Sequence, residues 1–199
     1  TFDITFKNTS ILSTLFFPNV KIGGQSRLSG NYNSNKQDLN LYGFFPYVKI
    51  NDYQFQNITL QGESPDDSLV IAASINQLAL SDSSNIENIR LKLISAHDSV
   101  TTFINWLNQS QKGYAADLQL QTTFNGFTKS EHRFVNSSVV INDSLWTFTD
   151  GNYLQVDSSA ITVKKLSIKS SLEELAIGGK VSLNPADTLS VVPCPPLVL

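Results

Sequence analysis

Apolar and polar side chains alternate along most of this 199-residue chain. The alternation is clearest in residues 2–6, 89–93 and 116–121. A period of two residues puts every apolar side chain on one face of a β-strand, whereas a helix needs a period near 3.6. Turn-forming residues separate these runs at short intervals, as they do between the strands of hairpins. The sequence therefore predicts an all-β fold whose strands each have one apolar and one polar face.

A short Asp-Ser/Thr-aliphatic motif recurs where strands are expected to begin. Aspartate and serine side chains bond to the backbone about two residues on, which closes a turn. The irregular spacing indicates a loose repeat of one hairpin device and not a solenoid of fixed period. The motif occurs at Asp67-Ser68-Leu69, Asp98-Ser99-Val100, Asp143-Ser144-Leu145 and Asp187-Thr188-Leu189.

Two segments fit helical spacing. Asn8, Thr9 and Ser10 offer N-caps for a short apolar run over residues 11–16 that Pro18 would end, so we predict one short N-terminal helix. Residues 100–107 fit a helix and a strand equally well, and their β-branched content favours a strand.

Composition narrows the functional class. The formal net charge is −3, from 14 Lys and Arg against 17 Asp and Glu, without the basic cluster that a nucleic-acid surface needs. We expect no nucleic-acid partner. No run approaches the ~20 apolar residues of a membrane-spanning helix. The chain starts at Thr1 and has no Met, so we expect an internal piece of a longer exported protein. Its single cysteine, Cys194, excludes an internal disulfide and a cysteine-built zinc site.

Groups that catalyse reactions are scarce. The two histidines, His97 and His132, stand in polar, turn-like sequence, where a surface role is expected. No Gly-x-Ser-x-Gly elbow and no Asp-x-Asp-x-Asp-Gly calcium loop occurs. Gly23-Gly24 and Gly178-Gly179 are too short for phosphate loops and indicate turns or bulges. We expect a protein that is not an enzyme, with no catalytic residues, no metal and no cofactor.

One aromatic cluster has two interpretations. Tyr42-Gly43-Phe44-Phe45-Pro46-Tyr47 could stack against a sugar, or it could be an apolar strand end capped by Pro46. We favour the strand end.

Several segments together resemble the TamB family, the translocation and assembly module proteins of Gram-negative envelopes that are related to AsmA. The likeness extends from about residue 10 to residue 192, and the tail from Pro193 departs from it. The segments are Ser29-Gly30-Asn31-Tyr32-Asn33-Ser34 followed by Asp38-Leu39-Asn40-Leu41-Tyr42-Gly43-Phe44-Phe45-Pro46, then Val140-Ile141-Asn142-Asp143-Ser144-Leu145-Trp146, and Leu175-Ala176-Ile177-Gly178-Gly179-Lys180-Val181-Ser182 leading into Asp187-Thr188-Leu189.

The resemblance implies a β-taco, an elongated U-shaped amphipathic sheet with an apolar groove. It implies one segment over residues 1–192 and an irregular tail over 193–199. Such proteins lie in the periplasm, anchored in the inner membrane by a part outside this piece. They are linked to phospholipid transport between the membranes and to outer-membrane protein assembly. The implied partners are phospholipid acyl chains and a barrel-type outer-membrane protein resembling TamA or BamA.

Alternation puts a set of residues on the apolar face, and the resemblance makes them the lining of the groove. These predicted groove residues are Leu39, Leu41, Ile58, Leu60, Leu69, Ile71, Ile89, Leu91, Leu118, Leu120, Ile161, Val163, Leu166, Ile168, Leu175, Ile177 and Val181.

Two other functions fit the same alternation. One is an extracellular carbohydrate-binding or adhesive β-sandwich, and the other is a structural spacer with an ordinary closed core. A sandwich core is sealed by a second sheet at ~10 Å, whereas a groove stays partly open.

Overall fold

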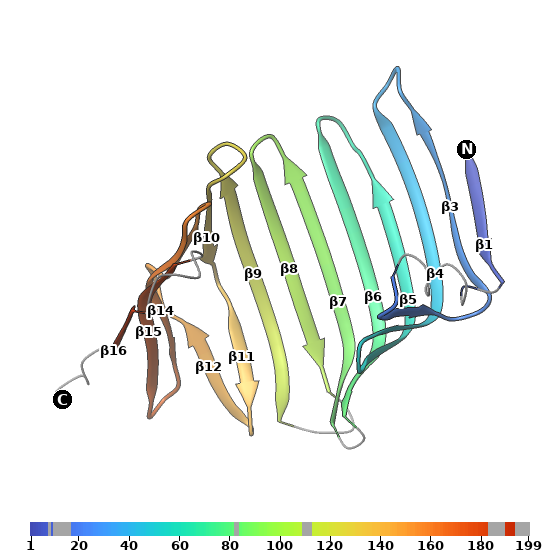
Figure 1. Ribbon diagram of the computed structural model, residues 1–199. Coiled ribbons are helices and arrows are strands. Elements are labelled where there is room, and N and C mark those ends of the chain that lie inside the picture. The colour runs from blue at the N-terminus through green and yellow to red at the C-terminus, as the bar shows by residue number, and fades with distance from the viewer. Residues whose placement is uncertain (8, 10–16, 82–83, 109–112, 183–189, 194–199) are drawn as a thin grey trace. The chain divides into compact units, whose positions relative to one another are not determined.

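The computed structural model describes residues 1–7, 9, 17–81, 84–108, 113–182 and 190–193 (Figure 1). The described residues form sixteen strands and no helix, which confirms the all-β prediction. Residues 100–107 lie in a strand, as predicted. The predicted N-terminal helix falls almost wholly on residues outside the described part.

The chain divides into two compact units. Unit 1 comprises Thr1–His97 and Phe103–Lys112, and unit 2 comprises Asp98–Thr102 and Gly113–Leu199. The division falls within β8 (Ser99–Leu107). The prediction of a single segment over 1–192 stays a prediction.

Unit 1 is an antiparallel sheet in which β1, β3, β4, β5, β6 and β7 are neighbours in that order. Strand β2 pairs with the far end of β4, and residues 103–107 of β8 also belong to this unit. The strands are β1 (Phe2–Phe6), β2 (Val20–Ile22), β3 (Ser26–Asn33), β4 (Asp38–Ile50), β5 (Tyr53–Glu63), β6 (Ser68–Ser81) and β7 (Ser84–Ala96).

The long strands of unit 1 are interrupted along one line across the sheet. Gln25, Asn57 and Asn88 have left-handed backbone angles, with φ of 67°, 50° and 53°. Asn57 stands between the rungs Ile58↔Ile75 and Gln56↔Gln77, and Asn88 stands between Ile75↔Ile89 and Gln77↔Glu87. Figure 1 shows the ribbons of β4 and β5 changing direction close to β2. We call this line, residues 23–25, 46–47, 56–57, 76–77 and 87–88, the bend row.

In β5 and β6, the apolar positions of this face are three residues apart across the bend row and two apart on either side of it. Phe55 is followed by Ile58 in β5, and Ile75 by Leu78 in β6. The chain thus changes the phase of its alternation at the same point in neighbouring strands. The rung Phe55↔Leu78↔Ile86 keeps the apolar side chains beyond the bend row next to one another.

Unit 2 is also antiparallel. In two places, a long strand pairs on one side with two short strands in succession, so that the pairing partner is broken in the middle. The two halves of β9 (Tyr114–Phe124) pair with β10 (Ser130–Phe134) and β11 (Ser138–Ile141). The two ends of β14 (Ala160–Lys169) pair with β13 (Tyr153–Val156) and β12 (Ser144–Phe148). Beyond β14 come β15 (Glu174–Ser182) and β16 (Ser190–Pro193).

Buried side-chain amides and hydroxyls replace backbone partners at the breaks. The Asn152 carboxamide accepts from the Phe134 N–H at 2.6 Å and donates to the Phe134 carbonyl at 2.8 Å. In unit 1, Asn108 bonds in the same way to the Glu87 N–H and the Asn85 carbonyl, both at 2.9 Å. Ser137 Oγ accepts from the Gln119 N–H at 2.8 Å. Buried backbone groups left without partners would cost free energy, so these side chains make the breaks tolerable.

Turn chemistry follows the sequence. Asp67, Asp98 and Asp143 directly precede β6, β8 and β12, which confirms the Asp-Ser/Thr motif as a strand start at three places. The fourth, at Asp187, lies outside the described residues. The Asp157 carboxylate accepts from the hydroxyl and the N–H of Ser159 and from the N–H of Ala160. These bonds lower its pKa to about 2.

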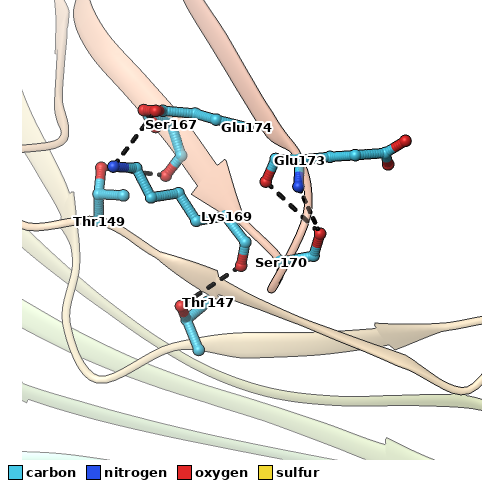
Figure 2. Close-up of polar contacts among 7 residues, drawn as sticks. All are labelled: Thr147, Thr149, Ser167, Lys169, Ser170, Glu173 and Glu174. Carbon is cyan, nitrogen blue, oxygen red and sulfur yellow. Dashed lines mark hydrogen bonds and ion pairs between the residues drawn. The ribbon is translucent and has the colours of Figure 1, made fainter. Parts of the chain in front are cut away.

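The polar face of β12, β14 and β15 holds a network of polar contacts (Figure 2). The fully buried hydroxyl of Ser167 donates to Glu174 Oε1 at 2.6 Å, and Lys169 Nζ lies 3.2 Å from Glu174 Oε2. Thr149 Oγ1 donates to the Ser167 carbonyl at 3.3 Å. The hydrogen bond from Ser167 is the largest cause that lowers the pKa of Glu174. These side chains bond to one another, so the network is structural.

The left-handed residues of the bend row give a first test. We expect Asn57→Val to lower the free energy of unfolding by about 1–2 kcal/mol, because a β-branched residue is strained at positive φ. Asn57→Gly should stay near wild type, because glycine adopts this conformation freely. The control is Asn76→Val in β6, whose φ is not positive. Urea unfolding measures all three, and equal effects of the two valines would contradict the assignment.

Candidate functional site

The registers of unit 1 place its predicted groove residues on one face. Ile58 pairs with Ile75, which pairs with Ile89, and Leu60 is linked through Ala73 to Leu91. Leu41 is linked through Gly62 to Ile71, and Leu39 and Leu69 lie on the same face of their strands. Directly paired residues of antiparallel strands share a face, so these side chains form continuous rows.

Large and small residues alternate along these rows. A Cβ on Gly62 would lie 3.2 Å from Leu41 Cβ, and one on Gly43 would lie 2.9 Å from the Phe45 ring and 3.2 Å from Leu60 Cβ. The neighbouring apolar side chains therefore lie over the glycines and cover the backbone there.

The predicted groove residues of unit 2 also share one face. Val163 pairs with Leu154, Ile161 with Val156 and Val181, Leu166 with Ile177, and Ile168 with Leu175. Two lysines, Lys164 and Lys165, separate Val163 from Leu166 at a register shift, so the spacing of three residues recurs here. Leu118 and Leu120 alternate on β9, and Leu120 pairs with Phe134.

Burial is low across both apolar faces. Among the described residues only two apolar side chains are buried, Ala116 at 6% exposure and Ala160 at 1%. None of the predicted groove residues is buried: most are half-buried, and Leu175, Ile177 and Val181 are 53%, 48% and 41% exposed. The described part therefore lacks the sealed core of large aliphatic side chains that a sandwich has.

The apolar faces hold further side chains outside the predicted set. Phe134 and Phe148 stack with their ring centroids 4.4 Å apart, and the Phe6 and Phe45 rings lie 6.4 Å apart. The alternation of residues 2–6 was visible in the sequence. Phe134 and Phe148 meet only because β10 and β12 belong to two broken strands, which local spacing does not reveal.

The structure corrects two predictions about individual residues. His132 is in strand β10 and not in a turn; it pairs with Thr122 and Leu154 on the apolar face. Its ring nitrogens lie 3.0 Å from Thr122 Oγ1 and 2.9 Å from Ser130 Oγ, so a polar patch interrupts this face. Pro46 does not cap a strand end, because it lies inside β4. His97 is an exposed turn residue, as predicted.

A hollow of about 600 Å³ lies on unit 1. Most of its lining belongs to the polar face, where Tyr42 pairs with Gln61 and Asn40 with Glu63. A second hollow, of about 510 Å³, lies along β6 to β8 near Arg90, Lys92 and Phe103.

The described residues include no group of three or more His, Cys, Asp or Glu side chains placed to hold a metal ion. In the same part of the chain there is no helix of the length and hydropathy that crossing a membrane requires.

Comparisons with known proteins found no matching family model, no matching curated protein and no matching solved structure.

The patch around His132 predicts a pH effect on stability. Burial lowers the pKa of His132 below its usual 6.5. The folded state therefore binds this proton less readily than the unfolded state. The contribution of His132 to stability is complete above pH 6.5 and is lost as the pH falls toward the lowered value.

We expect thermal melts between about pH 7.5 and 5.5 to show a smaller loss of Tm for His132→Gln than for wild type. The exposed control His97→Gln should keep the wild-type dependence. A His132→Gln protein with the full wild-type loss would show that another group is responsible.

Proposed function

We propose that this chain is a periplasmic segment of a TamB- or AsmA-like protein, and that its apolar sheet face forms a groove for phospholipid acyl chains moving between the inner and outer membranes. One observation carries the proposal: the predicted groove residues share a face in each unit, and none of them is buried. An apolar face this extensive and this open is the surface that an acyl chain needs.

The bend row supports the finer proposal of a U-shaped sheet. Left-handed residues lie at the same level within β5 and β7, at Asn57 and Asn88, and in the turn that leads into β3, at Gln25. The spacing of three residues at the bend would let apolar side chains on both arms face inward, while polar residues such as Asn57 and Asn76 occupy the outside of the bend. We infer that the strands fold across their length and that the apolar face lines the inside of the fold.

The energetics of such a groove are simple. An acyl chain leaving a bilayer exposes apolar surface to water at a cost of about 0.8 kcal/mol per methylene. A half-exposed row of Leu, Ile and Val side chains offsets most of this cost at every position along the path. The headgroup stays in water, and no step makes or breaks a bond. Weak and uniform contact suits transport, because a tight site would retain the lipid.

Location and partners complete the proposal. The resemblance of residues 29–46, 140–146 and 175–189 to TamB proteins supports a periplasmic location, an anchor in the inner membrane outside this piece, and a barrel-type outer-membrane partner resembling TamA or BamA. It also supports a link to the assembly of outer-membrane proteins.

A sandwich is less well supported, since a second sheet would seal one apolar face. Among the apolar side chains of the described residues, only Ala116 and Ala160 are as buried as those of a sealed core.

The first test of the proposed function is whether the groove contains lipid. We expect protein purified from a Gram-negative host to carry phospholipid or detergent, because an open apolar face binds amphiphiles present in the extract. Native mass spectrometry and lipid extraction measure this directly. Protein that is free of lipid and does not bind a fluorescent fatty acid would argue against the groove.

The second test places a charge on the apolar face. Val163 lies at the centre of its face, between Leu154 of β13 and Gly179 of β15. We expect Val163→Arg to fold with nearly native circular dichroism and Tm, because the guanidinium can reach water along its aliphatic stem. Lipid binding should be lost, because the acyl chain would meet a hydrated charge.

The matched control is Thr162→Arg, the adjacent residue on the opposite face of β14, which should bind lipid as wild type does. In a sealed core, Val163→Arg would bury an unpaired charge and cost several kcal/mol. Unfolding by Val163→Arg alone would therefore refute an open groove.

A further inference from the structure

The hollow on unit 1 has a lining unlike that of the apolar face. Tyr42 and Gln61 occupy one rung of its floor, and the next rung on that face is Asn40 and Glu63. Ser29 pairs with Tyr42, and Ala72 pairs with Gln61, so both continue this rung. Their small side chains leave space above the sheet on either side of the two larger residues. Val70 and three residues of the opposite face, Gly30, Leu41 and Gly62, also line the hollow.

Tyr42 presents an aromatic surface to water within this hollow. Its side chain is 46% exposed and lies between the short Ser29 and the amide of Gln61. In the described part of the chain, Tyr42, Gln61 and Glu63 form no side-chain hydrogen bond. The ring and these polar groups are therefore available to a ligand.

Polar groups surround the ring with mixed hydrogen-bonding character. The Asn40 amide donates to Asn31 Oδ1 at 3.4 Å and to Asp38 Oδ1 at 3.3 Å, which orients it. Amides of Asn31, Asn40 and Gln61 supply both donors and acceptors, and the Glu63 carboxylate supplies acceptors only. One cation, Lys92, and one anion, Glu63, line the hollow, so its charge is balanced.

We propose that this hollow is a binding site for a neutral oligosaccharide. A sugar ring has an apolar C–H face that stacks on an aromatic ring, and a rim of hydroxyls that both donate and accept hydrogen bonds. Tyr42 matches the first feature, and the amides with Glu63 match the second. Balanced charge does not favour a phosphate-bearing ligand. An acyl chain would remove the polar side chains of Asn40, Gln61 and Glu63 from water without giving them a hydrogen-bond partner. The volume of about 600 Å³ lies in the range of small-ligand sites.

The aromatic ring and the polar side chains of this site lie on the face opposite the proposed lipid groove. Tyr42 is paired through Gln61 to Ala72, whereas Leu41 is paired through Gly62 to Ile71, so the two rungs face opposite sides of the sheet. The sugar site goes beyond the proposed function, and either can fail without the other.

The experiment is a titration of the whole chain with neutral oligosaccharides of four to six units from the cello-, xylo-, malto- and chito- series. Amide chemical shifts detect binding at ligand concentrations up to the order of 10 mM, where weak sites saturate. We expect at least one series to bind saturably and to shift the amides of residues 29–31, 40–42 and 61–63. No binding by any series would overturn the proposal, as would shifts confined to other residues.

Variants then test the ring. Tyr42→Ala should weaken binding by at least tenfold, and Tyr42→Phe, which keeps the ring, should retain most of it. The control Tyr53→Ala removes a similarly exposed ring, at 49%, from the first position of β5 outside the hollow, and should bind as wild type does. Equal affinity of Tyr42→Ala and wild type would overturn the proposal, and so would tighter binding of an extended peptide than of any sugar. Because amide shifts map the site on the wild-type chain, the proposal stays testable even where a variant folds poorly.

Discussion

Strand register is the constraint on which the rest of this structure depends. A β-sheet with no sealed core keeps its faces distinct only if every strand pairs so that apolar side chains meet apolar side chains. The rungs Ile58↔Ile75 and Ile75↔Ile89 satisfy this condition through three strands. A shift of one residue in any strand would move its entire apolar set to the other side. The rows of aliphatic side chains and the polar hollow behind them both follow from this pairing.

A bend in the middle of a strand disrupts the register unless the chain compensates for it. In unit 1, left-handed residues and a change in the phase of the apolar–polar alternation keep the strands paired through the bend. In unit 2 the chain uses strands split into two halves. Asn108 in unit 1 and Asn152 in unit 2 occupy the places of missing peptide groups. Each bonds to backbone N–H and C=O groups of a neighbouring strand. The same residue type thus serves two roles, since asparagine tolerates positive φ and its side chain resembles a peptide unit.

Local patterns predicted the strands and not their arrangement. Alternation identified the apolar positions, and Asp67, Asp98 and Asp143 marked strand starts, because both signals reside in a few consecutive residues. The bend at Asn57 and the position of His132 within a strand were missed, since each depends on partners distant in sequence. The hollow around Tyr42 was missed for the same reason: its lining comes from five strands, and the sequence offered only the aromatic ring.

The low burial of the apolar faces has a thermodynamic consequence. The heat-capacity increase on unfolding arises mainly from apolar surface that becomes hydrated, and is about 12–15 cal/mol/K per residue in globular domains. Here much of that surface is already in contact with water in the folded chain, because only Ala116 and Ala160 are buried among the described apolar residues. The increment per residue is therefore smaller, and the stability curve is broad and shallow. A protein of this kind keeps nearly constant stability over a wide span of temperature and has a weakened tendency to denature in the cold.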